Sequence, residues 1–216
     1  MIQVKNALQL AAMRDAGRIT GEALLAARDY LREGITTYEL DRVIHNAIVK
    51  AGAKPSFLGY YDFPASACIS INDEVIHGIP SKRRVIRAGD IVKIDVGAYY
   101  HGVHGDSART IAVGEVSETA KKLIEVTRES FFRGVAAISV GNRLGDVGHA
   151  IDSYVVENGF STVKRYIGHG IGAQLHESPD GWTVKTADHS LSAHYENTIA
   201  LVGDRVEILT LIDPQF

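Results

Sequence analysis

Hydrophobic residues recur every three or four positions over residues 8–31, which predicts an amphipathic helix. The pattern stops before Gly34, a residue type that often ends a helix in the left-handed conformation. Residues 36–39 (Thr-Thr-Tyr-Glu) then match a capping box, in which the threonine hydroxyl and the glutamate each satisfy a free amide. A second helix should therefore begin at this point and end near Gly52.

Later in the chain, hydrophobic and β-branched residues gather in short runs that are typical of strands. These runs cover residues 67–71, 91–96 and 107–113. Two further periodic segments predict helices at about 117–138 and 144–158. A late strand-like run ends at Glu196. Helices and strands thus combine in an α+β arrangement.

The two predicted pairs of helices share one spacing. The distance from Gly34 to Gly52 is 18 positions, as is that from Gly141 to Gly159, and the second segment lies 107 positions after the first. This shift places the hydrophobic stripe of one helix on that of the other. We therefore expect two similar halves that are related by a pseudo-two-fold axis. The alternative is a chance alignment of two amphipathic helices.

The composition narrows the class of protein. Of the 216 residues 45% are hydrophobic and 23% charged, so the chain can form a core and is not disordered. The formal net charge of −3 provides no positive field for nucleic acid or an anionic membrane. A single cysteine forms no internal disulfide, and neither a signal peptide nor a membrane span is apparent. We expect a soluble cytoplasmic protein with one domain over residues 1–216, whose halves cover about 1–110 and 111–216.

Two aspartates occupy an unusual setting. Asp95 interrupts a hydrophobic strand and should face away from the hydrophobic side chains next to it. Asp106 follows 11 positions later, a spacing that suits a hairpin on which the two carboxylates meet. Close carboxylates repel each other unless a positive charge lies between them, so a pair of divalent metal ions would account for both. Alternatively, Asp95 caps a turn and Asp106 pairs with Arg109.

Some histidines are candidates for the same site. His169 lies between two glycines, which let the backbone approach a ligand and orient the imidazole, although a lone histidine is more often structural. His77 and His176 are further candidates. The other histidines should lie on helix surfaces or turns in contact with solvent; they are His45, His101, His104, His149, His189 and His194.

Six segments, in this order, resemble the bacterial type I methionyl aminopeptidases: GAKPSF, INDEVIHGIP, KIDVGAYYHGVHGDSART, GHGIGAQLHESP, DGWTVKTAD and LSAHYENTI. The resemblance covers nearly the whole chain. It implies the pita-bread fold, in which two pseudo-symmetric α/β halves surround a curved antiparallel sheet and a dinuclear metal centre. It also implies removal of the initiator methionine from nascent proteins. The expected cofactors are two divalent ions (Co, Mn, Fe(II) or Zn). The expected partners are peptides with an N-terminal methionine and the ribosome, with no nucleic acid or membrane, for a protein that is itself a monomer.

The resemblance also assigns roles to individual residues. Four residues match metal ligands: Asp95, Asp106, His169 and Glu196. Of these, Asp106 and Glu196 match the ligands that bridge the two ions. His77 and His176 match the catalytic histidines that contact the substrate and the tetrahedral intermediate. The residues that match the pocket for the methionine side chain are Tyr60, Phe63, Cys68 and Trp182.

The chain departs from the family pattern in one region. The family carries a fifth ligand, a glutamate in a Thr-Ile-Glu-Pro motif, between its HExP and DGWT motifs. Here residues 176–179 (HESP) run directly into 180–183 (DGWT), and the family's usual histidine after the last ligand is Asn197. We expect a true deletion, with Pro179 joined to Asp180, an opened cleft and one weak metal position. The alternatives are a sequence that lacks part of the natural chain, or a non-catalytic pita-bread module that binds peptides or proteins. A proline-cleaving relative is less expected, because such enzymes usually carry an extra N-terminal domain.

Overall fold

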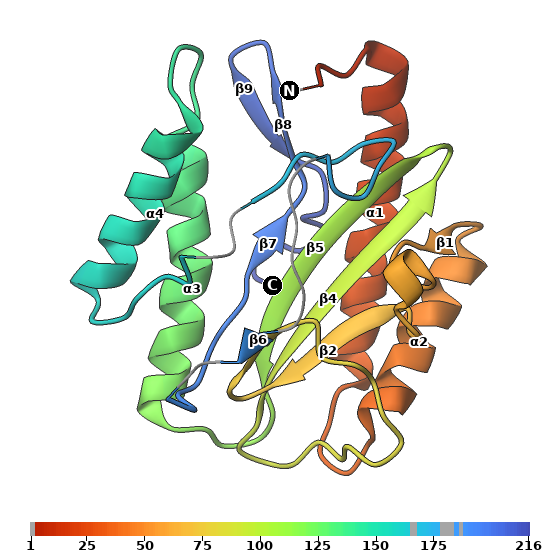
Figure 1. Ribbon diagram of the computed structural model, residues 1–216, viewed down its shortest axis with the longest axis vertical. Helices are drawn as coiled ribbons and strands as arrows, with labels where there is room; N and C mark the ends of the chain where they lie inside the picture. Colours follow the sequence, from red (N-terminus) through yellow and green to blue (C-terminus); the bar gives the residue numbers. More distant parts are fainter. Residues whose placement is uncertain (1–2, 165–167, 178–183, 186–187) are drawn as a thin grey trace.

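The computed structural model describes all residues except 1–2, 165–167, 178–183 and 186–187 (Figure 1). Its elements are α1 (Ala7–Tyr30), α2 (Thr37–Lys50), β1 (Lys54–Pro55), the 3-10 turn η1 (Tyr60–Asp62), β2 (Ala67–Ile71), β3 (Glu74–Ile76), β4 (Ile91–Tyr100), β5 (Val103–Ala112), α3 (Glu118–Ala136), α4 (Leu144–Glu157), β6 (Val184–Lys185), β7 (Glu196–Asn197), β8 (Ile199–Val202) and β9 (Arg205–Ile208). Among the described residues, no helix is both long and apolar enough to cross a membrane.

A five-stranded antiparallel sheet forms the centre of the fold. β4 and β5 pair along their whole length, β1 and β2 pair with the other edge of β4, and β7 pairs with β5. The helix α1 packs on β4 and β5, and α2 packs on β2. Figure 1 shows α3 and α4 on the opposite side of the view, with the β4–β5 hairpin between the two helical pairs. The strands β3 and β6, and the strands β8 and β9, form two small separate sheets.

The main core lies between the sheet and the first two helices. Alternate residues of β4, namely Val92, Ile94 and Val96, are fully buried there against α1 and α2. Since successive side chains of a strand point to opposite faces, Asp95 faces the other way, as the sequence pattern predicts. The strand therefore separates a hydrophobic face from a face that carries polar groups.

The helix boundaries agree closely with the sequence pattern. Thr36 and Glu39 form the predicted capping box at the start of α2, and Asn6 and Gln9 form another at the start of α1 that the hydrophobic pattern did not indicate. Shifting the bounds of α2 by 107 positions gives those of α4, and both helices have 14 residues. All four glycines that define this spacing have φ between 78° and 98°, in the left-handed region.

The strands of the central hairpin are longer than predicted. β4 continues to Tyr100 and β5 begins at Val103, so only His101 and Gly102 connect them. Both connecting residues have positive φ, 47° and 86°, as a two-residue turn of type I′ requires. The dipeptide His-Gly is a less common form of this turn than Asn-Gly, which is why the sequence pattern indicated a longer turn region.

The second pair of helices is much less buried than the first. Val155 is the one buried residue of α4, whereas α2 buries five residues. Near the start of α4, Val140 and Leu144 are 73% and 80% exposed. The two helices pack mainly on each other. In the part of the chain that the structure describes, the first half therefore provides most of the sheet and most of the core.

Candidate metal centre

The two aspartates meet on the face of the β4–β5 hairpin opposite α1 and α2, here called the open face, as predicted. Asp106 pairs with Gly97 and Asp95 with Ala108, so the two acids are diagonal neighbours on the same face. The amide of Asp106 donates to the Thr198 hydroxyl at 2.9 Å, and that hydroxyl donates to the Asp106 carbonyl at 2.8 Å. These bonds fix the backbone that carries the Asp106 carboxylate.

Asp106, His169 and Glu196 converge from three separate parts of the chain. One ligand atom of each lies within 4.8 Å of those of the other two. The Nε2 atom of His169 is 3.6 Å from Oδ2 of Asp106 and 3.6 Å from Oε1 of Glu196. These distances are long for hydrogen bonds, but donors on a common ion lie about 3–4 Å apart when each bond is near 2.1 Å. Nδ1 of His169 faces the Gly170 carbonyl at 3.0 Å, which turns Nε2 toward the carboxylates.

Asp95 lies outside this group of three but next to Asp106. The Oδ1 atoms of both aspartates are buried and have no hydrogen-bond partner among the described residues. Burial, and then the charge of Asp106, raise the pKa of Asp95 well above its usual range, and burial also raises the pKa of Asp106. Buried carboxylate oxygens without partners are costly, and a divalent cation would satisfy them. The donor set thus fits hard divalent ions.

The imidazoles of the site differ in charge. Burial disfavours a charged His169, but Asp106 and Glu196 outweigh it and raise the pKa of this imidazole to about 9. Burial, together with His194 and His176, lowers the pKa of His77 to about 4. His77 also has a φ of 60°, which is uncommon for a residue other than glycine and occurs frequently at functional sites.

His176 lies beside the three converging residues. Its ring centroid is 4.3 Å from that of His169. Its Nδ1 atom is 2.9 Å from the Tyr60 hydroxyl, so Tyr60 orients the ring. The structure therefore brings one catalytic candidate and one candidate of the methionine pocket next to the candidate metal ligands.

The expectation of a solvated surface position is wrong for three histidines, His194, His104 and His45. His194 places Nε2 3.0 Å from Oε2 of Glu196, and burial raises the pKa of this carboxyl less than His194, His169 and His176 together lower it. His104 bonds the Ser56 hydroxyl at 2.8 Å, and burial lowers its pKa to about 4. His45 is half-buried and bonds Ser66 at 2.9 Å. The sequence could have indicated His104 and His194, because they lie two positions before Asp106 and Glu196. On a strand, residues two positions apart point to the same face.

Arg109 does not pair with Asp106, and that alternative reading is wrong. The guanidinium donates to the carbonyls of Ala108, Glu196 and Phe216, and to side-chain oxygens of Ser107 and Asn197.

Of the predicted methionine pocket, the structure places three members. Phe63 and Cys68 are buried in a small hydrophobic cluster against which Tyr60 packs. Cys68 pairs directly with Asp95 across β2 and β4, so the cluster adjoins the acidic group. Burial raises the pKa of the Cys68 thiol well above its ordinary value, and the side chain behaves as a small apolar group. Trp182 and the Pro179–Asp180 junction lie outside the described residues.

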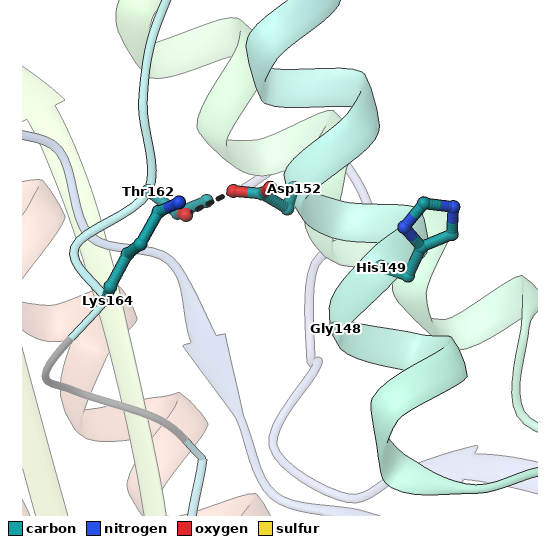
Figure 2. Close-up of a pocket in the computed structure, with 5 residues that line it drawn as sticks. All are labelled: Gly148, His149, Asp152, Thr162 and Lys164. Atoms are coloured by element: carbon teal, nitrogen blue, oxygen red, sulfur yellow. Dashed lines mark hydrogen bonds between the residues drawn. The ribbon is translucent and has the colours of Figure 1, made fainter.

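A different, open pocket of about 290 Å³ lies against α4 (Figure 2). Its lining consists of Gly148, His149, Asp152, Thr162 and Lys164. The Thr162 hydroxyl donates to Asp152, and the His149 ring points away from this pair in Figure 2. None of the predicted site residues lines this pocket.

A pita-bread fold with an Asp-His-Glu group on the open face of its sheet is the arrangement of a metal-dependent hydrolase. The sequence profile of metallopeptidase family M24 matches residues 11–201, and the chain belongs to this family. It is 45% identical to the methionine aminopeptidase of Clostridium acetobutylicum over 250 aligned positions, which cover 99% of this chain and all of the relative. Identity to methionine aminopeptidase 1 of Bacillus subtilis is 39%, over 98% of this chain and all of that protein.

Solved structures agree with this assignment. The crystal structure of methionine aminopeptidase from Thermotoga maritima superposes with a TM-score of 0.94 at 36% identity, covering 97% of this chain and 99% of that one. The prolidase from Pyrococcus furiosus has a TM-score of 0.79 at 24% identity, over 96% of this chain and 65% of that one, and shares the fold.

The alignment lengths also bear on the shortened region. An alignment of 250 positions against a chain of 216 residues leaves at least 34 positions of the Clostridium acetobutylicum relative without a counterpart here. The chain is therefore short for its family, in agreement with the expectation from the joined HExP and DGWT motifs.

Proposed function

We propose that this chain is a metal-dependent aminopeptidase that removes the N-terminal methionine from nascent proteins and peptides. The observation that carries the proposal is the convergence of ligand atoms from Asp106, His169 and Glu196 in a chain of the M24 family. We further propose that it acts as a cytoplasmic monomer on chains that emerge from the ribosome. The rival function, a peptide-binding module without catalysis, has no observation in its favour.

The residues of the open face would divide two metal positions between them. Asp106, His169 and Glu196 would hold the first ion, and Asp95, Asp106 and Glu196 the second. An oxygen-rich site with one imidazole accepts Co, Mn, Fe(II) or Zn. A divalent ion held there supplies the Lewis acidity that activates water and polarises a peptide carbonyl. The family's fifth ligand, a glutamate, would belong to the position with His169, so we expect this position to bind its ion more weakly than the position formed by Asp95, Asp106 and Glu196.

The chain's own histidines would then act on the substrate. With a pKa of about 4, His77 is neutral at pH 7, so its imidazole donates a hydrogen bond without adding positive charge beside a cation. The Tyr60 hydroxyl contacts Nδ1 of His176 and so orients this imidazole beside the candidate ligands, where it would contact the peptide. The apolar cluster around Phe63 and Cys68 offers a thioether a surface free of charge.

The test combines metal content with product release. Purified protein incubated with Mn²⁺, Co²⁺, Fe²⁺ or Zn²⁺ should release free methionine from a Met-Ala-Ser peptide, and Asp106→Asn should abolish both metal binding and release. His149→Ala, on the exposed surface of α4, is the matched control and should change neither. Binding of the peptide by folded, metal-loaded protein without any methionine release would favour the rival function.

A further inference from the structure

The segment that carries Glu196 is attached to the sheet in an unusual way. The strand β7 consists of two residues, which pair with Ser107 and Ala108 of β5. The preceding residues, from Ser192 onward, have no place in a described strand. Backbone pairing alone is therefore a weak support for a side chain whose position must be accurate.

Side chains of β4 and β5 provide the missing support. Nζ of Lys93 donates to the Ser192 carbonyl at 2.8 Å. The Thr110 hydroxyl donates to the His194 carbonyl at 2.8 Å and accepts from the His194 amide at 2.7 Å. Nη1 of Arg109 donates to the Glu196 carbonyl at 2.8 Å. The bonded carbonyls belong to alternate residues, as expected when an extended segment lies with one edge on the sheet.

Arg109 makes the most extensive of these contacts. It is 3% exposed, and its guanidinium reaches the Glu196 carbonyl through Nη1 and the Asn197 side-chain oxygen, at 2.7 Å, through Nη2. The Tyr195 ring lies under it, 4.1 Å from Cζ to the ring centroid. Burying a guanidinium is costly unless its donors are satisfied. Here two nitrogens of the planar guanidinium each bond one of two successive residues, a fixed geometry that the single nitrogen of a lysine does not reproduce.

The carboxylate end of Glu196 is held as well. Nε2 of His194 lies 3.0 Å from Oε2, while Oε1 faces His169 at 3.6 Å. The main chain of Glu196 is thus fixed from β5 and its side chain from His194. Displacements of about 1 Å in a catalytic site lower rates substantially, so the main-chain anchor should matter for function.

We propose that Arg109 is a positioning residue of the metal centre, which clamps the main chain of Glu196 so that its carboxylate meets Asp106 and His169. This inference rests on the proposed function, because it takes Glu196 as a metal ligand. Arg109 acts through the main-chain carbonyl of Glu196 and the side chain of Asn197.

The test uses Arg109→Lys, which keeps a positive charge but loses the fork. Arg28→Lys is the matched control, because Arg28 contacts the Phe216 ring, as Arg109 does, and does not hold Glu196. The Kd for Mn²⁺, measured by titration calorimetry, should rise about 10–100-fold in Arg109→Lys, as for other residues that orient ligands, and should stay unchanged in the control. kcat for Met-Ala-Ser should fall more than KM changes, and circular dichroism should report an intact fold.

A second variant keeps the proposal testable if Arg109→Lys does not fold. Ser107→Ala removes a hydroxyl that also donates to the Glu196 carbonyl, at 2.6 Å, and should raise the Kd for Mn²⁺ about threefold, as loss of one hydrogen bond does. If folded Arg109→Lys binds Mn²⁺ with the affinity of the parent, the proposed role of Arg109 is wrong, but the proposed function is not affected. If Arg109→Lys is unfolded, the same conclusion follows from a parent-like affinity in Ser107→Ala. A parent protein that binds no Mn²⁺ overturns both. A parent that binds Mn²⁺ but releases no methionine overturns the proposed function alone, and the affinities still decide on the clamp.

Discussion

The charge on His169 should make the metal-free protein more stable at low pH than at high pH. Its pKa is raised from an ordinary 6.5 to about 9, because attraction to Asp106 and Glu196 outweighs burial. A group whose pKa is higher in the folded state contributes stability that is fully present below the unfolded value, here 6.5, and is lost as pH rises through 9. The shift corresponds to about 3 kcal/mol, at 1.36 kcal/mol for each unit. The side chain is only 13% exposed, so solvent screens little of this energy.

The assay compares the parent with His169→Gln by urea unfolding in EDTA. The measured quantity is the free energy of unfolding of the parent minus that of the variant. This difference should be about 3 kcal/mol larger at pH 6 than at pH 10, because histidine titrates over this range and glutamine does not. Saturating Mn²⁺ should remove this pattern, because a histidine must be neutral to bind a metal. A difference between parent and variant that is the same at pH 6 and pH 10 in EDTA would refute the charge assignment.

Three further predictions concern packing, catalysis and specificity. Gly78→Ala places a Cβ 2.2 Å from the Ile69 carbonyl oxygen and should lower the free energy of unfolding by about 1–3 kcal/mol. In Gly148→Ala the new Cβ has no atom within 4 Å, and the free energy of unfolding should rise by up to about 1 kcal/mol. Thermal denaturation of both variants checks this prediction. His77→Ala and His176→Ala should each lower kcat about a hundredfold with little change in metal content, and unchanged turnover removes that histidine from the mechanism. If the short chain opens the cleft, Met-Ala, Met-Val and Met-Leu peptides should be cleaved at similar rates, and a steep preference for alanine would contradict an opened cleft.

The hydrophobic pattern was sufficient to predict those elements whose position depends on a single periodicity. Period 3.6 and flanking glycines located α2 and α4 within two residues, and β2 has the predicted bounds. Period 2 on β4 was enough to place Asp95 opposite the hydrophobic core. The hairpin then followed from the separation of 11 positions between Asp95 and Asp106, because two antiparallel strands must return the chain to the same place.

The sequence was insufficient where the partner of a side chain comes from a distant segment. Lys93 is 1% exposed, and its ammonium bonds the carbonyls of Asn72 and Ser192, which are 21 and 99 positions away. Closeness in sequence makes Arg109 a possible partner of Asp106, yet its guanidinium bonds residues 87 and 88 positions away. Local spacing carries no information about such contacts, since they depend on how the late segment crosses the sheet.

The two helical pairs differ in burial, and the segment that carries Glu196 lies on the sheet with little backbone pairing. The helix α4 buries Val155 alone, whereas α2 buries five residues. A late segment with few neighbouring strands cannot be held by a long ladder, and β7 indeed pairs over two residues. Side-chain donors on β4 and β5 are the remaining way to fix Glu196, and they are buried cations and hydroxyls because only these reach across to main-chain carbonyls. The candidate metal centre thus depends on the β4–β5 hairpin, which packs against α1 in the well-packed first half of the molecule.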